Sequence, residues 1–320
     1  MTEIKQALEK FFSKKDDKIK AIIEKLGNKR IIEKCQFACE GDEGNLGKPI
    51  SEGAKEAKVA FKKNAEECPA ASLIDVVMAS GRDYNKIVKP SMIKIRGSKS
   101  LEFVGSKENS IESLQMFLKK KLKKFHSDFI GKKATPITSK TSKKEYDKKE
   151  LDFLKKELFF NDSAPKKMYM LISIINKILE MKKSGIYSAK SDYELMNLWA
   201  SDPKKNYVDE NGVEIVKNIE VAFGEKIKWV GPATIQHLRM HFGVNTFKPD
   251  QRVKEVLIQE FLGLDIKKFK SGQLKDTDAI LMMEKIRTAV DGAFGQPDKL
   301  ILDSILVNYG SGYTENKARN

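Results

Sequence analysis

The sequence predicts a predominantly α-helical protein. Apolar residues recur near the 3.6-residue period of an α-helix along most of the chain, most clearly between residues 3 and 26. Alternating apolar and polar residues, which are typical of a half-buried strand, are rare. Residues typical of helix ends, such as Gly27-Asn28 and Gly243, separate the periodic segments.

The expected helices follow one another along the whole chain. After the first at 3–26, we expect helices near residues 29–39, 51–65, 70–80, 83–89, 109–130, 147–160, 165–183, 191–200, 211–223, 276–293 and 297–309. The least helical stretch is 91–105, where alternation favours a short β-hairpin carried by Ile93, Ile95, Leu101 and Phe103. Pro90 is expected to end the helix before it.

Length and composition bound the class of protein. A chain of 320 residues makes one large or two ordinary domains, and 40% hydrophobic with 33% charged residues is typical of a globular protein. No apolar run approaches the roughly 20 residues of a membrane span, and the N-terminus lacks the pattern of a signal peptide. We therefore expect a monomer in the cytoplasm or nucleoid, with no membrane partner.

The cysteines argue against a disulfide framework, because there are only three, Cys35, Cys39 and Cys68. Cys35 and Cys39 lie one helical turn apart, but no fourth cysteine completes a four-thiolate metal site. We interpret the three as buried or unreactive thiols.

The formal net charge of +15 favours a polyanionic partner. Most of the cations are Lys, which also serves as a general solubilising residue, and Arg is the better reader of phosphate. Between Lys119 and Lys149 there are twelve Lys against three acids. Within this stretch we expect an exposed basic loop at 131–146, which is either an arm on a DNA backbone or a solvated loop.

The strongest local signal begins at residue 228. An apolar residue, Gly-Pro and a small residue open an amphipathic helix in the run Lys228, Trp229, Val230, Gly231, Pro232, Ala233 and Thr234. Glycine permits a tight turn and close approach of the backbone, and Pro232 suits the first helical turn. The free N–H groups of that turn, together with the helix dipole, form a site for one phosphate.

A second element follows this helix. The helix ends at Gly243, and a turn containing Pro249 leads to Asp250 and a new helix at Gln251-Arg252-Val253. The order of these elements resembles the HhH-GPD (helix-hairpin-helix) superfamily of DNA base-excision glycosylases. In that family a Gly/Pro hairpin precedes, by roughly twenty residues, a Pro-rich turn and an aspartate at a helix start.

The resemblance implies a two-lobed helical glycosylase fold. One lobe is expected to combine residues 1–110 with 275–320, and the other to comprise 111–274 with the hairpin and aspartate at 225–253. The resemblance also implies that the active cleft lies between the lobes and that the partner is double-stranded DNA.

Asp250 is the catalytic candidate that the resemblance implies. Breaking an N-glycosidic bond builds positive charge on the sugar, which a carboxylate stabilises while it orients or deprotonates the attacking water. An aspartate that follows Pro at a helix start is also a common N-terminal cap, and that second interpretation stays open.

Departures from the family pattern sharpen the expected chemistry. Trp229 replaces the first hairpin glycine, and Ala233 stands where bifunctional members carry the lysine that forms a covalent imine. We therefore expect base removal without strand cleavage. No cysteine follows Cys68, so the iron–sulfur cluster of some members is not expected. No cofactor or metal is expected, although a hairpin of this kind can hold a monovalent cation.

A weaker match covers residues 72–85, which look like an early helix and turn of uncharacterised bacterial HhH-GPD-like proteins. In better-known members this turn enters the minor groove, so Arg82, Tyr84 and Asn85 are candidate DNA contacts in the turn at 81–85. The alternative is a helix cap with a core-facing Tyr84.

Two histidines, His237 and His241, have the i,i+4 spacing of metal ligands, but no glutamate base or third ligand accompanies them. We expect them to face solvent or DNA, with Arg239 between them as a candidate phosphate contact. 

The function expected from the sequence is that of a monofunctional glycosylase that hydrolyses the N-glycosidic bond of a damaged or modified base in duplex DNA. The alternatives are a non-catalytic helix-hairpin-helix DNA-binding protein and an RNA-binding protein that uses the same basic surface. The excised base stays open between an oxidised purine, an alkylated base, uracil and a modified phage base.

Overall fold

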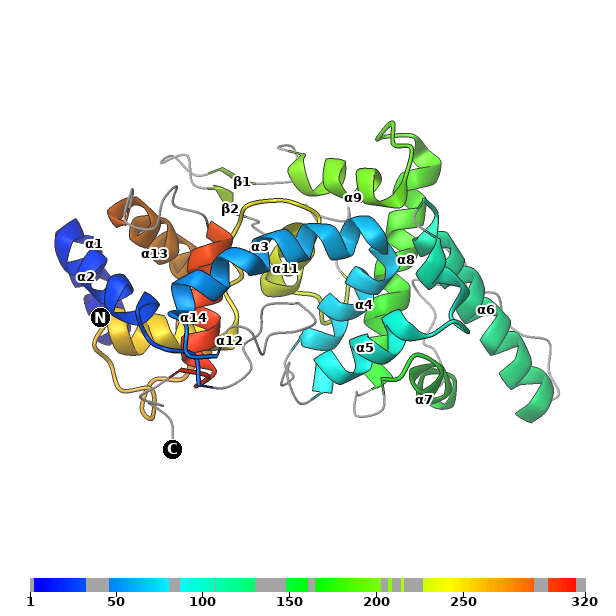
Figure 1. The fold of residues 1–320 in the computed structure, drawn as a ribbon, viewed down its shortest axis with the longest axis horizontal. Helices are drawn as coiled ribbons and strands as arrows, with labels where there is room; N and C mark the ends of the chain where they lie inside the picture. Colours follow the sequence, from blue (N-terminus) through cyan, green and yellow to red (C-terminus); the bar gives the residue numbers. More distant parts are fainter. Residues whose placement is uncertain are drawn as a thin grey trace. The chain divides into compact units, whose positions relative to one another are not determined.

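The described part of the chain is mostly helical in a computed structural model (Figure 1). The structure describes residues 3–32, 46–80, 87–106, 108–129, 148–160, 165–202, 207–208, 214–215, 227–290 and 299–314. The prediction of an all-α class is confirmed, with one two-stranded sheet as the exception among these residues. No helix in these ranges is long and apolar enough to cross a membrane.

The chain divides into two compact units. Unit 1 comprises Met1–Phe61, Asn206–Lys217 and Asn245–Asn320, and unit 2 comprises Lys62–Lys205 and Asn218–Val244. The lobe boundaries expected from the sequence, at 110/111 and 274/275, differ from these. The apolar periodicity of each helix shows which of its faces is buried, but not which other helices share its core. The division of the chain into two units therefore does not follow from the sequence pattern.

Unit 1 is built around a core of apolar residues from both ends of the chain. Its helices are α1 (Glu3–Phe12), α2 (Asp16–Gly27), the first part of α3 (Ile50–Glu67), α12 (Gln251–Val256), the π-helical η6 (Leu257–Phe261), the short η7 (Ser271–Gln273), α13 (Asp276–Ala289) and α14 (Lys299–Gly310). The strands β1 (Tyr207–Val208) and β2 (Glu214–Ile215) pair antiparallel in this unit.

Unit 2 is built around α4, whose residues from Pro69 to Met78 are all buried. Its helices are the end of α3, α4 (Pro69–Ala79), α5 (Lys89–Gly97), η3 (Glu102–Gly105), α6 (Ser110–Phe129), α7 (Lys148–Glu157), α8 (Pro165–Ser184), α9 (Asp192–Ser201) and α11 (Pro232–His241). Helices α6, α8 and α11 all pack on α4. This position explains why α4 is buried on every side and is mostly apolar.

The hairpin expected at 91–105 is wrong, because α5 and η3 occupy this stretch. Ile95 and Phe103 are both buried, so the alternation came from two short helical segments that each bury one face. Pro90, expected to end a helix, instead lies in the first turn of α5, where its missing N–H costs no helical hydrogen bond.

The single helix expected at 3–26 is two helices. Its backbone breaks after Phe12, and Lys14 in the break donates to the carbonyl of Phe261 at 3.0 Å. Asp16 and Asp17 lie in the first turn of α2, where their negative charges interact favourably with the positive end of the helix dipole.

Two other expected helices are also corrected. Arg30 and Ile31, within the helix expected at 29–39, form isolated β-bridges, and residues 33–39 lie outside the described residues. Within the helix expected at 211–223, Glu214–Ile215 is strand β2, and the other residues of that range lie outside the description. Backbone pairing with another segment decides both cases, and helical periodicity carries no signal for such pairing.

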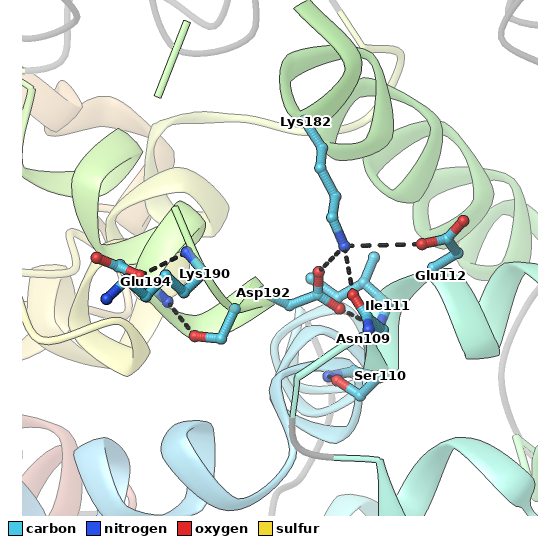
Figure 2. A network of polar contacts seen from close by, with 10 residues as sticks. Asn109, Ser110, Ile111, Glu112, Lys182, Lys190, Asp192 and Glu194 are labelled. Atoms are coloured by element: carbon cyan, nitrogen blue, oxygen red, sulfur yellow. Dashed lines mark hydrogen bonds and ion pairs between the residues drawn. The ribbon is translucent and has the colours of Figure 1, made fainter. Parts of the chain in front are cut away.

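A buried carboxylate joins three elements of unit 2 (Figure 2). Asp192 accepts a hydrogen bond from the Ile111 N–H at 2.7 Å and one from the Lys182 ammonium at 3.0 Å. Lys182 also donates to Asn109 at 2.7 Å. Burial raises the pKa of Asp192, and the Ile111 N–H and Lys182 act in the opposite direction. The side chain thereby satisfies an otherwise unbonded N–H at the start of α6 and fixes α9 and α8 to it.

Close approach of two helices organises the core of unit 1. Helix α14, red in Figure 1, packs on α12. At Gly310 an added Cβ would lie 2.9 Å from the Arg252 carbonyl oxygen and 2.9 Å from a methyl group of Val256. Any larger residue at this position therefore pushes α14 away from α12.

We predict that Gly310→Ala lowers the free energy of unfolding by about 1–3 kcal/mol, because the methyl group meets backbone as well as side chain. Urea denaturation measures the change. Gly272→Ala is the matched control in the same unit, because a Cβ there meets no atom within 4 Å. Equal effects of the two substitutions would contradict this account of the packing.

Candidate functional site

The predicted hairpin begins with a tight turn in unit 2. The Val230 N–H donates to the Ile227 carbonyl at 3.1 Å, and Trp229 has a φ of 66°. A positive φ at this place in a turn favours glycine and costs another residue about 1–2 kcal/mol. Trp229 occupies the position at which the helix-hairpin-helix pattern has its first glycine. The backbone there has a conformation that suits glycine, although the residue is tryptophan.

The chain then enters α11 at Gly231, the N-terminal cap, with Pro232 in the first turn. Thr234 donates its N–H to the Gly231 carbonyl at 3.0 Å, and its side chain is buried. Because Val230 is also buried and bonded through its N–H, these two residues offer no free donor to a phosphate.

The remaining donors at this turn are few. Among the described residues, the N–H groups of Gly231 and Ala233 take part in no recorded hydrogen bond. Lys228 beside them is exposed. The predicted phosphate site is therefore reduced to two N–H groups and one ammonium.

Arg239 and the two histidines are corrected, because all three are buried in α11. The Arg239 guanidinium donates to the Ala200 carbonyl at 2.9 Å and to the Gln236 side chain at 2.8 Å, so it binds the end of α9 rather than solvent. His237 and His241 face each other with their Nε2 atoms 3.3 Å apart. Within the described ranges, no group of three or more His, Cys, Asp and Glu side chains could hold a metal ion.

The segment that leads to Asp250 lies in unit 1 along the first turn of α14. The Asn245 side chain accepts from the Leu300 N–H at 3.3 Å. Three residues on, the Lys248 N–H donates to Asp303 Oδ1 at 2.8 Å. The two bonds therefore fix residues 245 and 248 of this segment on the beginning of α14.

A tight turn and a cap then position Asp250. Its N–H donates to the Lys248 carbonyl at 2.7 Å across Pro249, which closes a three-residue turn. Its Oδ1 accepts from the Val253 N–H at 3.0 Å, and its Oδ2 lies 3.1 Å from the Lys248 ammonium. The side chain is 24% exposed. Asp250 is therefore an N-terminal cap of α12 with its orientation fixed by three contacts, and it remains open to solvent in part.

Asp303 lies beneath this turn and was not anticipated from the sequence. Its pKa is raised to about 7, mainly by burial and also by the charge of Asp250, while Lys248 acts in the opposite direction through its charge and its N–H. The signal in the sequence was one acid inside the apolar stretch of α14, where a charge is costly unless it has a partner. The site thus contains two carboxyl groups and one ammonium, held at the start of α12, on α14 and on the segment before α12.

The remaining predicted positions cannot be placed. Arg82, Tyr84 and Asn85, and the basic loop 131–146, lie outside the described residues, as do Cys35 and Cys39. Cys68 is a buried free thiol, as expected, and donates to the Phe103 carbonyl at 3.6 Å. Burial raises the pKa of this thiol, which makes it a poor nucleophile.

Comparison with known proteins does not assign the chain to a family. No protein-family model, curated protein or solved structure matches the chain. The hairpin residues and Asp250 belong to different units, with the boundary at 244/245.

Asp303 makes a specific prediction about pH. In the unfolded chain an aspartate ionises near pH 4, whereas burial raises the pKa of Asp303 to about 7 in the folded protein. Between these values the folded state binds more protons, so this group's stabilising contribution is complete below pH 4 and is lost as the pH rises through 7.

The measurement compares the wild type with Asp303→Asn, which keeps the Oδ1 acceptor for Lys248 but does not ionise. The stability of the wild type relative to this variant should fall by about 2–3 kcal/mol between pH 5 and pH 8. A difference that stays constant over this range would show that Asp303 does not titrate there.

Proposed function

We propose that this protein is a monofunctional DNA glycosylase that hydrolyses the N-glycosidic bond of a damaged or modified base, with Asp250 as the catalytic carboxylate. The observation that carries the proposal is the geometry of Asp250. Its carboxylate lies at the start of α12, fixed by Val253 and Lys248, and is 24% exposed. A reactive group needs this combination of fixed orientation and access.

The chemistry follows from charge. As the glycosidic bond breaks, positive charge develops on the sugar, and a fixed carboxylate stabilises it without reorganisation. The same carboxylate orients or deprotonates the water that attacks. Lys248 pairs with Asp250 in the absence of substrate, and a DNA phosphate offers its ammonium a second anionic partner.

Asp303 supports the catalytic group without facing solvent, since it is only 3% exposed. Its bond to the Lys248 N–H holds the turn from which Asp250 projects. We therefore assign it as a positioning residue and Asp250 as the reacting one. In unit 2, the N–H groups of Gly231 and Ala233 with Lys228 supply the proposed contact with one phosphate.

A second candidate function is a DNA-binding protein without catalysis. The observation that favours it is the hydrogen bond from the Val253 N–H to Asp250, which is the ordinary contact of a helix cap. In that case the carboxylate serves only to start α12.

Asp250→Asn separates these functions. Asparagine caps a helix about as well as aspartate, so the fold should persist. If Asp250 stabilises the transition state, base release from single-lesion duplexes should fall by about 100-fold or more, with DNA affinity within a few-fold of the wild type. Single-turnover assays with alkali treatment, alongside fluorescence anisotropy, measure both quantities.

The control is Asp278→Asn, which changes a carboxylate in the first turn of α13 in the same unit. It should leave base release unchanged. Retained release in Asp250→Asn would remove the catalytic role and leave the second candidate function.

The position of Ala233 predicts the product. Without an amine at this position no covalent imine forms there, so the reaction should leave an intact strand with an abasic site. Gel analysis before and after alkali treatment distinguishes the two products. Strand cleavage in the absence of alkali, in preparations where Asp250→Asn abolishes it, would contradict this prediction.

A further inference from the structure

An exposed tryptophan stands at the hairpin of unit 2. Trp229 is 48% exposed, and Phe12 is the other aromatic residue among the large exposed hydrophobics of the described part of the chain. Tryptophan is the most costly side chain to leave in water by apolar area, so exposure of half of it is unfavourable unless a ligand covers it.

Two neighbours set the orientation of the indole. Tyr169, on α8, contacts it with the two ring planes at 86° and the centroids 5.5 Å apart. The Lys228 ammonium lies over the ring, 4.6 Å from its centroid. The ring is therefore held by a perpendicular aromatic contact and a cation, while a large part of its surface stays open to solvent.

The backbone beneath this ring is unfavourable for tryptophan. With φ at 66°, Trp229 occupies a conformation that glycine adopts without strain. The contact with Tyr169 leaves half of the side chain exposed, and the backbone of the turn suits a smaller residue, so neither burial nor backbone preference accounts for tryptophan here. The exposed π-surface is the property that a smaller residue does not supply.

We propose that Trp229 stacks on a nucleobase that lies outside the helical stack of the bound DNA, with Lys228 moving from the indole to a phosphate of the same strand. This inference rests on the proposed function. Every base has a π-face, so stacking on an aromatic side chain requires no particular base, and a cation beside it suits the attached phosphate. Flat aromatic surface, an adjacent ammonium and a rigid support are together the features of a stacking site for nucleic acid.

The net charge of the chain favours this occupant over an apolar protein partner. The protein carries +15 formal charges, and the neighbour of Trp229 on the chain is itself a lysine. A nucleotide presents both of the surfaces that match, a π-face for the indole and a phosphate for the ammonium, in one ligand.

The test uses the fluorescence of the full-length protein. The chain has two tryptophans, and Trp199 is buried at 2% exposure, so a ligand-induced change reports mainly on Trp229. The probes are an intact duplex and the same duplex with one unpaired base. We expect quenching on binding, stronger with the unpaired base, and the same quenching in Trp199→Phe.

Variants then measure the contribution to affinity by anisotropy of the labelled duplex with the unpaired base. Trp229→Gly suits the backbone of the turn, and Trp229→Leu keeps an apolar side chain without a π-face. Both should bind about 5- to 100-fold more weakly, whereas Trp229→Phe should stay within a few-fold of the wild type. Phe12→Leu is the control for an exposed aromatic residue and should bind unchanged.

The outcomes separate this inference from the proposed function. Salt-dependent DNA binding and Asp250-dependent base release, without quenching and with full affinity in Trp229→Gly, would overturn the stacking role alone. Absence of DNA binding in the wild type would overturn both. Quenching with loss of affinity in the Gly and Leu variants, but without base release, supports stacking in a DNA-binding protein that is not a glycosylase.

Discussion

The hydrogen bond between the buried Asp303 carboxyl group and the Lys248 N–H is the contact on which the candidate site depends. It joins α14 to the segment before α12, and the turn that presents Asp250 starts from the same residue. Close packing of α12 on α14 at Gly310 keeps the two helices near enough for this bond. Burial of an acid is costly, and the N–H of Lys248 and its ammonium offset part of that cost.

Buried polar groups have a similar role in unit 2. Asp192 satisfies the N–H of Ile111 at the start of α6, and Arg239 satisfies the Ala200 carbonyl at the end of α9. Helix ends expose unbonded backbone groups, and a helical protein with few strands has many such ends to satisfy. Arg239, which the sequence offers as a phosphate contact, therefore serves the fold. Among the described residues discussed for the candidate site, Lys228, Trp229 and the partly open Asp250 remain accessible to a ligand.

The two proposals use different parts of the molecule and different physics. Asp250 in unit 1 provides a fixed negative charge for a developing cation. Trp229 in unit 2 provides an uncharged flat surface for a base, and Lys228 provides a charge for a phosphate. In the proposed catalytic site, Asp303 holds the turn that orients Asp250. In the proposed stacking site, the perpendicular contact of Tyr169 orients the exposed ring of Trp229.

The sequence by itself determined the helical class, most helix positions and the cap of α12 at Asp250, because apolar periodicity and end signals are local properties. Local pattern also located the start of α11 at Gly231-Pro232, whereas the positive φ at Trp229 came from the structure. Only the tertiary structure decided that Arg239, His237 and His241 are buried, and that Pro90 opens a helix. The role of Asp303 likewise came from the fold. Its partner Lys248 lies 55 residues away in the chain, and a contact over that separation leaves no periodic trace in the sequence.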